Sequence, residues 1–116
     1  SQVCDEIAAA ASFDIIEKNS TNGFVEPAFE SWRAAHPTVD TFLVVGDCTD
    51  ICVSQFALTA KAYFNTRDIP SRIVVPAALV DTFDGDGHDA ALFHLFALCS
   101  MQQNGVELCR TILTEA

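Results

Sequence analysis

Apolar and polar residues alternate along the chain in a pattern that predicts helices separated by short buried strands. Helical spacing or capping residues indicate helices over 1–11, 27–35, 50–65 and 88–103. Short apolar runs predict strands over 12–18, 41–45, 71–75 and 106–109. The helical pattern is clearest over 50–65, where an apolar stripe is formed by Val53, Phe56, Ala57, Ala60 and Phe64. Because helices that alternate with strands are typical of a parallel sheet with helices on its faces, we expect an α/β fold.

The segment from residue 41 to residue 53 contains the side chain with the clearest chemistry, the thiol of Cys52. Residues 41–45 suit a buried strand, Gly46 permits a sharp turn, and Thr49 or Asp50 can cap the helix that follows. Cys52 then lies within about one turn of a helix N-terminus, where free N–H groups and the helix dipole favour a thiolate. A cysteine on an apolar helix is also commonly core filler, so the pattern leaves both interpretations open.

Composition and charge narrow the class of protein. A chain of 116 residues, half of them apolar, can form one domain (1–116) with a modest core. The net charge of −10 argues against nucleic acid as a partner. No apolar run approaches the roughly 20 residues of a membrane span. Five cysteines, an odd number without scaffold-like spacing, fit a reducing compartment. We therefore expect a cytoplasmic protein that binds neither nucleic acid nor membrane.

Cys48 and Cys52 form a C-x3-C pair, which raises the question of a metal site. Zinc sites usually need a second pair of this kind or histidines at ligand spacing, and neither accompanies this pair. His36, His88 and His94 stand at a helix end, near a helix start and within a helix, where we expect structural or surface roles. No metal site is predicted within this chain.

Two segments resemble the isochorismatase-like cysteine hydrolases, and within them the nicotinamidases and nicotinamidase-like amidases. The first is 18–24, Lys-Asn-Ser-Thr-Asn-Gly-Phe, and the second is 45–53, which contains Gly-x-x-Thr-Asp-x-Cys-Val. Residues 81–84 and 88–90 are similar to the last third of that family. The resemblance implies a Rossmann-like, three-layer α/β/α fold with a mainly parallel sheet.

The resemblance also implies roles for individual residues. Cys52 corresponds to the nucleophile that attacks an amide carbonyl, forms a thioester and releases ammonia. Lys18 corresponds to the lysine that stabilises the thiolate and helps move a proton to the leaving group. The backbone N–H groups of Cys48 and Cys52 match the oxyanion hole, and the family has a cis peptide at the position of Asp47–Cys48. Phe24 matches an aromatic position near the ring of a bound substrate, although a core role is about equally open.

The chain departs from the family in its first part. The aspartate of the family's Asp-Lys-Cys triad, and the metal ligands of nicotinamidases, lie upstream of every residue in this sequence. The family's first strand also runs between the strands that carry the lysine and the cysteine. We therefore predict that residues 1–116 are the C-terminal part of a longer hydrolase domain, whose N-terminal strands are missing from this chain. That N-terminal segment would be a partner of this chain, and it could contribute a divalent metal such as zinc. No cofactor is predicted within the chain itself.

The leading prediction of function is hydrolysis of a small carboxamide, with nicotinamide giving nicotinate and ammonia. One alternative is another small substrate, such as a carbamoyl compound or an isochorismate-like vinyl ether. A second alternative is a truncated, inactive interaction module, because the helix predicted over 88–103 is apolar around much of its circumference. Since relatives often assemble, we also expect a homo-oligomer.

Overall fold

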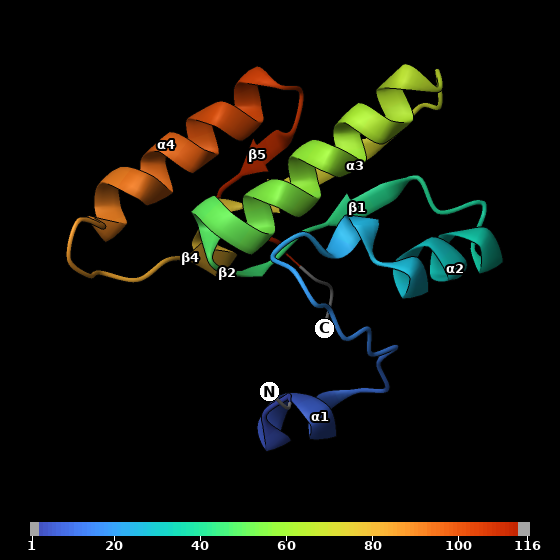
Figure 1. Cartoon of the computed structure of the whole chain (residues 1–116), viewed down its shortest axis with the longest axis horizontal. Coiled ribbons are helices and arrows are strands. Elements are labelled where there is room, and N and C mark those ends of the chain that lie inside the picture. The colour runs from blue at the N-terminus through green and yellow to red at the C-terminus, as the bar shows by residue number, and fades with distance from the viewer. Residues whose placement is uncertain (1–2, 114–116) are drawn as a thin grey trace.

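The protein, described over residues 3–113 by a computed structural model, is built from short parallel strands and the helices that follow them (Figure 1). The larger sheet has the strand order β1-β3-β5, and its neighbouring strands pair in parallel. A separate parallel pair is formed by β2 and β4. The strands are β1 (Thr41–Leu43), β2 (Gly46–Asp47), β3 (Arg72–Pro76), β4 (Val80–Asp81) and β5 (Glu107–Cys109). The parallel α/β fold predicted from the alternating pattern is confirmed.

The helices follow the predicted order, with ends that differ by a few residues. The longer ones are α1 (Asp5–Ala10), α2 (Pro27–Ala35), α3 (Ser54–Thr66) and α4 (Ala90–Gln103). Single helical turns are η1 (Gly23–Val25), η2 (Thr49–Val53) and η3 (Ala77–Leu79). In Figure 1, α3 and α4 lie side by side over the larger sheet, whereas α1 lies apart from the rest. No helix between residues 3 and 113 has the length and apolar character needed to cross a bilayer.

The core lies between α3 and the face of the larger sheet that carries Phe42 and Ile73, which are neighbours in the β1–β3 register. Ile73 and Met101 of α4 are fully buried. The stripe predicted on α3 faces this core, with Ala57 and Ala60 completely enclosed, and that prediction is confirmed. The neighbour of Phe42 on the opposite face, Leu43, is 53% exposed. The face that carries Phe42 and Ile73 is therefore covered by α3, which also brings the turn before it, η2, to the end of β2.

The prediction of a strand over residues 12–18 is wrong for the described structure. The backbone there makes no ladder with any strand of residues 3–113, and Ile15 is 69% exposed. The apolar run has strand propensity, but a strand exists only where a second strand accepts and donates its hydrogen bonds. The run therefore remains an irregular segment that leads from α1 to Lys18.

Two glycines have positive φ angles, and the turn that the sequence predicts at Gly46 is confirmed. Gly46 has φ +113°, which allows the chain to turn sharply after the first strand and enter β2. Gly105 has φ +91° and follows Asn104, the C-cap of α4, so it occupies the left-handed position just beyond the helix. A side chain at either position would be strained.

Candidate active site

Cys52 lies in η2, the five-residue π-helical turn that connects β2 to α3. The turn begins after Cys48, and the Cys48 carbonyl accepts hydrogen bonds from the N–H groups of Ile51 (3.1 Å) and Val53 (3.2 Å). Cys52 is partly buried rather than enclosed, and it is not in a disulfide. The thiol therefore lies within the first turn after a strand end and remains accessible.

Lys18 is brought to this thiol from a distant part of the sequence. Its Nζ atom lies 3.4 Å from the Sγ atom of Cys52, across a separation of 34 residues, and also donates to the Ser20 carbonyl at 3.3 Å. Lys18 itself is exposed. An ammonium group in contact with sulfur stabilises the negative charge of a thiolate. The structure thus places together the two side chains that the sequence singled out.

The loop that carries Lys18 is fastened to α3 by side-chain hydrogen bonds. The Asn22 Oδ1 atom accepts from the Phe24 N–H at 3.1 Å, and its Nδ2 atom donates to the Thr59 hydroxyl at 3.1 Å. Gln55 of α3 also donates to the Thr21 hydroxyl. Because Cys52 lies two residues before the start of α3, these contacts fix the loop to the helix that follows the thiol.

The peptide bond between Asp47 and Cys48 is cis, at the position where the resemblance implies such a bond. Cys48 is the residue that precedes η2 and is partly buried, like Cys52. The assignment of the Cys48 and Cys52 N–H groups to an oxyanion hole stays a prediction.

Phe24 lies in the core, which is the second of the two roles that the sequence left open. It is only 4% exposed. Its ring contacts those of Phe29 and Tyr63, each at a centroid distance of 5.3 Å, and that of Phe56 at 5.6 Å. The Arg33 guanidinium lies 4.7 Å from the Phe24 ring centroid on another side. Little of the Phe24 ring remains accessible, so we do not count Phe24 among the site residues. Contact between Phe24 and a substrate stays a prediction.

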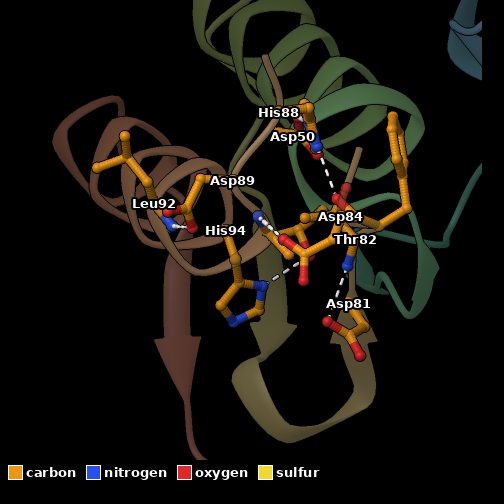
Figure 2. Close-up of polar contacts among 11 residues, drawn as sticks. Asp50, Asp81, Thr82, Asp84, His88, Asp89, Leu92 and His94 are labelled. Carbon is orange, nitrogen blue, oxygen red and sulfur yellow. Dashed lines mark hydrogen bonds and ion pairs between the residues drawn. The ribbon is translucent and has the colours of Figure 1, made fainter. Parts of the chain in front are cut away.

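Thr49 and Asp50 do not cap the helix as the sequence predicts. The η2 turn has no side-chain cap, and both side chains instead contact histidines from the last third of the chain. The Thr49 hydroxyl is fully buried and lies 2.8 Å from Nδ1 of His94 in α4. The Asp50 carboxylate lies 2.7 Å from Nε2 of His88, in the loop before α4. Figure 2 shows His88 beside Asp50, and His94 on α4.

The two groups of the His88–Asp50 pair shift each other's ionisation. Burial opposes ionisation of Asp50, but the side chains of Thr82 and His88 favour the carboxylate and hold the pKa of Asp50 below its usual value. The Asp50 carboxylate raises the pKa of His88, and burial opposes this shift while the Phe83 carbonyl supports it. Both shifts favour the charged forms, the His88 imidazolium and the Asp50 carboxylate.

Sequence reasoning missed these two contacts. It assigned His88 and His94 structural or surface roles, and both are indeed structural, but they brace the turn of the predicted nucleophile. The one signal for His88 was its place in the segment 88–90 that resembles the family. His36, in contrast, contacts the Trp32 carbonyl and stacks on the Trp32 ring, away from Cys52.

The described residues do not fit a metal ion. Among residues 3–113, no three His, Cys, Asp or Glu side chains are grouped closely enough to hold one. Cys48 and Cys52 therefore have no further ligands within the described chain, and we derive no chemical step through a metal.

Comparisons with known proteins identify the family and the fold. A model of the family described as the Isochorismatase domain matches residues 1–111. The chain is similar to the nicotinamidase SaPncA from Staphylococcus aureus, with a TM-score of 0.67 and 25% identity, over 93% of this chain and 60% of that chain. An isochorismatase-like hydrolase from Alkaliphilus metalliredigens has the same fold, with a TM-score of 0.59 and 15% identity, over 80% of this chain and 44% of that one. No curated protein sequence matches significantly. The chain thus spans less than two thirds of either solved structure.

Proposed function

The chain belongs to the isochorismatase-domain family of hydrolases, and from this premise we propose that it cleaves a small carboxamide through a thioester on Cys52. The single observation that carries the proposal is the 3.4 Å contact between Lys18 Nζ and Cys52 Sγ. A lysine and a cysteine 34 positions apart would not meet by local sequence preference, and a surface lysine gains little from an uncharged thiol.

The chemistry that fits this pair is acyl transfer. The Cys52 thiolate adds to the carbonyl carbon of the amide, and the carbon–nitrogen bond then breaks to leave a thioester. The departing nitrogen needs a proton to leave as ammonia, and the Lys18 ammonium is close enough to the sulfur to supply it. Water then attacks the thioester and passes a proton to the Lys18 amine, which releases the carboxylic acid and restores the thiolate and the ammonium.

Geometry around Cys52 supports this mechanism in two further ways. The thiol lies in a turn that starts at a strand end, where N–H groups without intrahelical partners can stabilise a developing oxyanion. The thiol is also only partly buried, so a small substrate can reach it. The resemblance assigns the acidic member of the triad to an upstream strand, so we give that role to none of the described residues.

Nicotinamide is the substrate that we propose first. Support comes from the likeness to a nicotinamidase at 25% identity and from the thiol, since acyl chemistry uses a nucleophile that vinyl ether hydrolysis does not need. A carbamoyl compound would use the same thiol and lysine, and it is therefore the substrate to compare.

The test measures ammonia release from nicotinamide, from a carbamoyl compound and from buffer alone. We expect turnover of nicotinamide by the unaltered protein and none by the Cys52→Ala variant. Cys99→Ala is the matched control, because Cys99 is an exposed cysteine on α4, and it should keep full activity. Circular dichroism would establish that both variants are folded. Equal turnover by Cys52→Ala and the unaltered protein would contradict the proposal.

A further inference from the structure

The ring of His88 is held on four sides. It stacks between the rings of Phe83 and Phe93, at centroid distances of 4.1 and 4.4 Å and interplanar angles of 11° and 12°. Its Nδ1 atom lies 2.6 Å from the Phe83 carbonyl oxygen, and its Nε2 atom lies 2.7 Å from Asp50 Oδ2. The His88 and Asp50 side chains are only 16% and 12% exposed. The ring therefore cannot turn without breaking contacts on every side.

These contacts determine the protonation of the ring. A carbonyl oxygen and a carboxylate oxygen are both acceptors, so both ring nitrogens must donate. Only the imidazolium form of histidine has two N–H donors. The Thr82 and His88 side chains hold the pKa of Asp50 below its usual value, against the effect of burial, which favours a proton on the ring over one on the carboxylate. The two flanking aromatic faces also favour a cation.

The loop that presents His88 is itself well fixed. Gly85 and His88 exchange two backbone hydrogen bonds of 2.9 Å, which close the loop. Asp84 accepts from the Ala90 N–H at 2.8 Å, and Asp89 caps α4 by accepting from the Leu92 N–H at 3.1 Å (Figure 2). His88 is thus a rigid donor at the start of α4 rather than a side chain on a free loop.

The acceptor, Asp50, is the second residue of η2, and Cys52 stands two positions later in the same turn. The Ile51 and Val53 N–H groups both donate to the Cys48 carbonyl, so the residues on either side of Cys52 are tied to the turn that Asp50 anchors. The groups that face His88 are the Asp50 carboxylate from η2 and the Asp84 carboxylate from its own loop, with Phe93 from α4 contributing only a ring.

We propose that His88, as an imidazolium, is a positioning residue for the nucleophile: it holds Asp50 and thereby the turn that places Cys52 against Lys18. This inference rests on the proposed function, in which Cys52 attacks the substrate. Loss of the His88 proton removes one of its two donors, so the ring can satisfy the Phe83 carbonyl or Asp50 but not both. The turn then loses one of its two contacts with histidines and keeps only that of Thr49 with His94, and Cys52 becomes less reactive.

The experiment compares two titrations on the same protein. Nuclear magnetic resonance follows the ring protons of the three histidines against pH. The alkylation rate of Cys52 by iodoacetamide is measured over the same range, with tandem mass spectrometry separating Cys52 from Cys48. Because the ionised fraction of a thiol rises with pH, the rate is divided by the thiolate fraction at each pH, and we expect this corrected alkylation rate to fall as His88 loses its proton. In His88→Gln this fall should be absent. The alkylation rate of this variant near pH 6 should be roughly tenfold below that of the unaltered protein, a smaller loss than the about 100-fold that a 1 Å misplacement can cause.

His36→Gln is the matched control. His36 also stacks on an aromatic ring, at 4.2 Å from that of Trp32, and contacts a backbone carbonyl, but no carboxylate of residues 3–113 pairs with it. It should leave the alkylation profile of Cys52 unchanged. An alkylation profile in His88→Gln identical to that of the unaltered protein would overturn the proposal, because a merely structural histidine affects stability alone.

A second variant keeps the test decisive if His88→Gln does not fold. Asp50→Asn keeps the size of the side chain but removes its charge, so His88 should titrate at lower pH and the fall in alkylation should move with it. A His88 titration unmoved by Asp50→Asn would also overturn the proposal. If Cys52 is alkylated with the predicted profile but no amide is hydrolysed, the proposed function fails while the positioning by His88 stands.

Discussion

The side-chain amide of Asn22 donates a 3.1 Å hydrogen bond to the hydroxyl of Thr59, and this contact joins the loop of Lys18 to the helix that follows Cys52. The two residues are 37 positions apart. The same Asn22 side chain accepts from the Phe24 N–H, so one amide fixes the loop internally and to its neighbour. The spacing between ammonium and thiol therefore depends on a residue that touches neither of them.

Asn22→Ala should lower the alkylation rate of Cys52 as well as stability. Loss of the partly buried amide should cost about 1 kcal/mol in the free energy of unfolding per hydrogen bond removed. The freed loop should also let Lys18 move from Cys52, which slows alkylation. Asn104→Ala is the control, because Asn104 donates to the Ser100 carbonyl at 2.8 Å at the other end of the chain. An effect of Asn22→Ala on stability alone would show that the loop holds its place without this amide.

Lys18→Met should slow alkylation of Cys52 several-fold near neutral pH, because the variant keeps the length of the side chain and removes the charge that stabilises the thiolate. The measurement is the pseudo-first-order rate with iodoacetamide. Lys61→Met is the matched control, since the Lys61 ammonium donates to the Ser71 carbonyl at 3.1 Å and does not contact Cys52. If both variants react at the rate of the unaltered protein, the lysine does not act on the thiol.

The ion pair of His88 and Asp50 should make stability depend on pH in a defined window. The pKa of His88 is raised, first because of its hydrogen bond with Asp50. The contribution of His88 to folding stability is therefore complete below the unfolded pKa, about 6.5, and is lost as pH rises through the folded pKa. The lowered pKa of Asp50 persists despite burial because Thr82 and His88 favour the carboxylate. The contribution of Asp50 to folding stability is complete above the unfolded pKa, about 3.9, and is lost as pH falls through the folded pKa.

The pair should therefore contribute most between roughly pH 4 and pH 6.5. The measurement is urea unfolding of the unaltered protein and of His88→Gln at a series of pH values. The difference in unfolding free energy between them should be largest in this window and should shrink on either side. A difference that is the same at every pH would contradict the ion pair.

Ile73→Ala should be among the most destabilising substitutions in the sheet. Ile73 is completely buried in the central strand β3, so its truncation removes apolar contacts and leaves a cavity, at a cost of about 2–5 kcal/mol. Leu95→Ala on α4 is the control, because Leu95 is 58% exposed and its truncation should change the free energy of unfolding by about 0.5 kcal/mol or less. Urea unfolding measures both, and equal costs would mean that the core lies elsewhere.

Local sequence was sufficient for features that depend on neighbouring residues. The stripe on α3 follows from helical spacing, and the positive φ angles of Gly46 and Gly105 follow from turns that side chains would strain. The place of Cys52 in the first turn after a strand follows from the order of apolar run, glycine and polar residues. Each of these is decided within a few positions along the chain, where backbone preference and amphipathic pattern act.

Tertiary structure alone decided which distant groups meet. The apolar run at 12–18 has the composition of a strand, yet it forms none in the described residues, because a strand needs a partner that composition cannot supply. Thr49 and Asp50 are residue types that commonly cap helices. Their side-chain oxygens instead contact His94 and His88, which lie 45 and 38 positions away. A side-chain oxygen accepts a hydrogen bond from whichever donor the packed fold brings within about 3 Å. Here the packing of η2 against α4 and the loop before it determines these donors, and the local sequence of η2 does not.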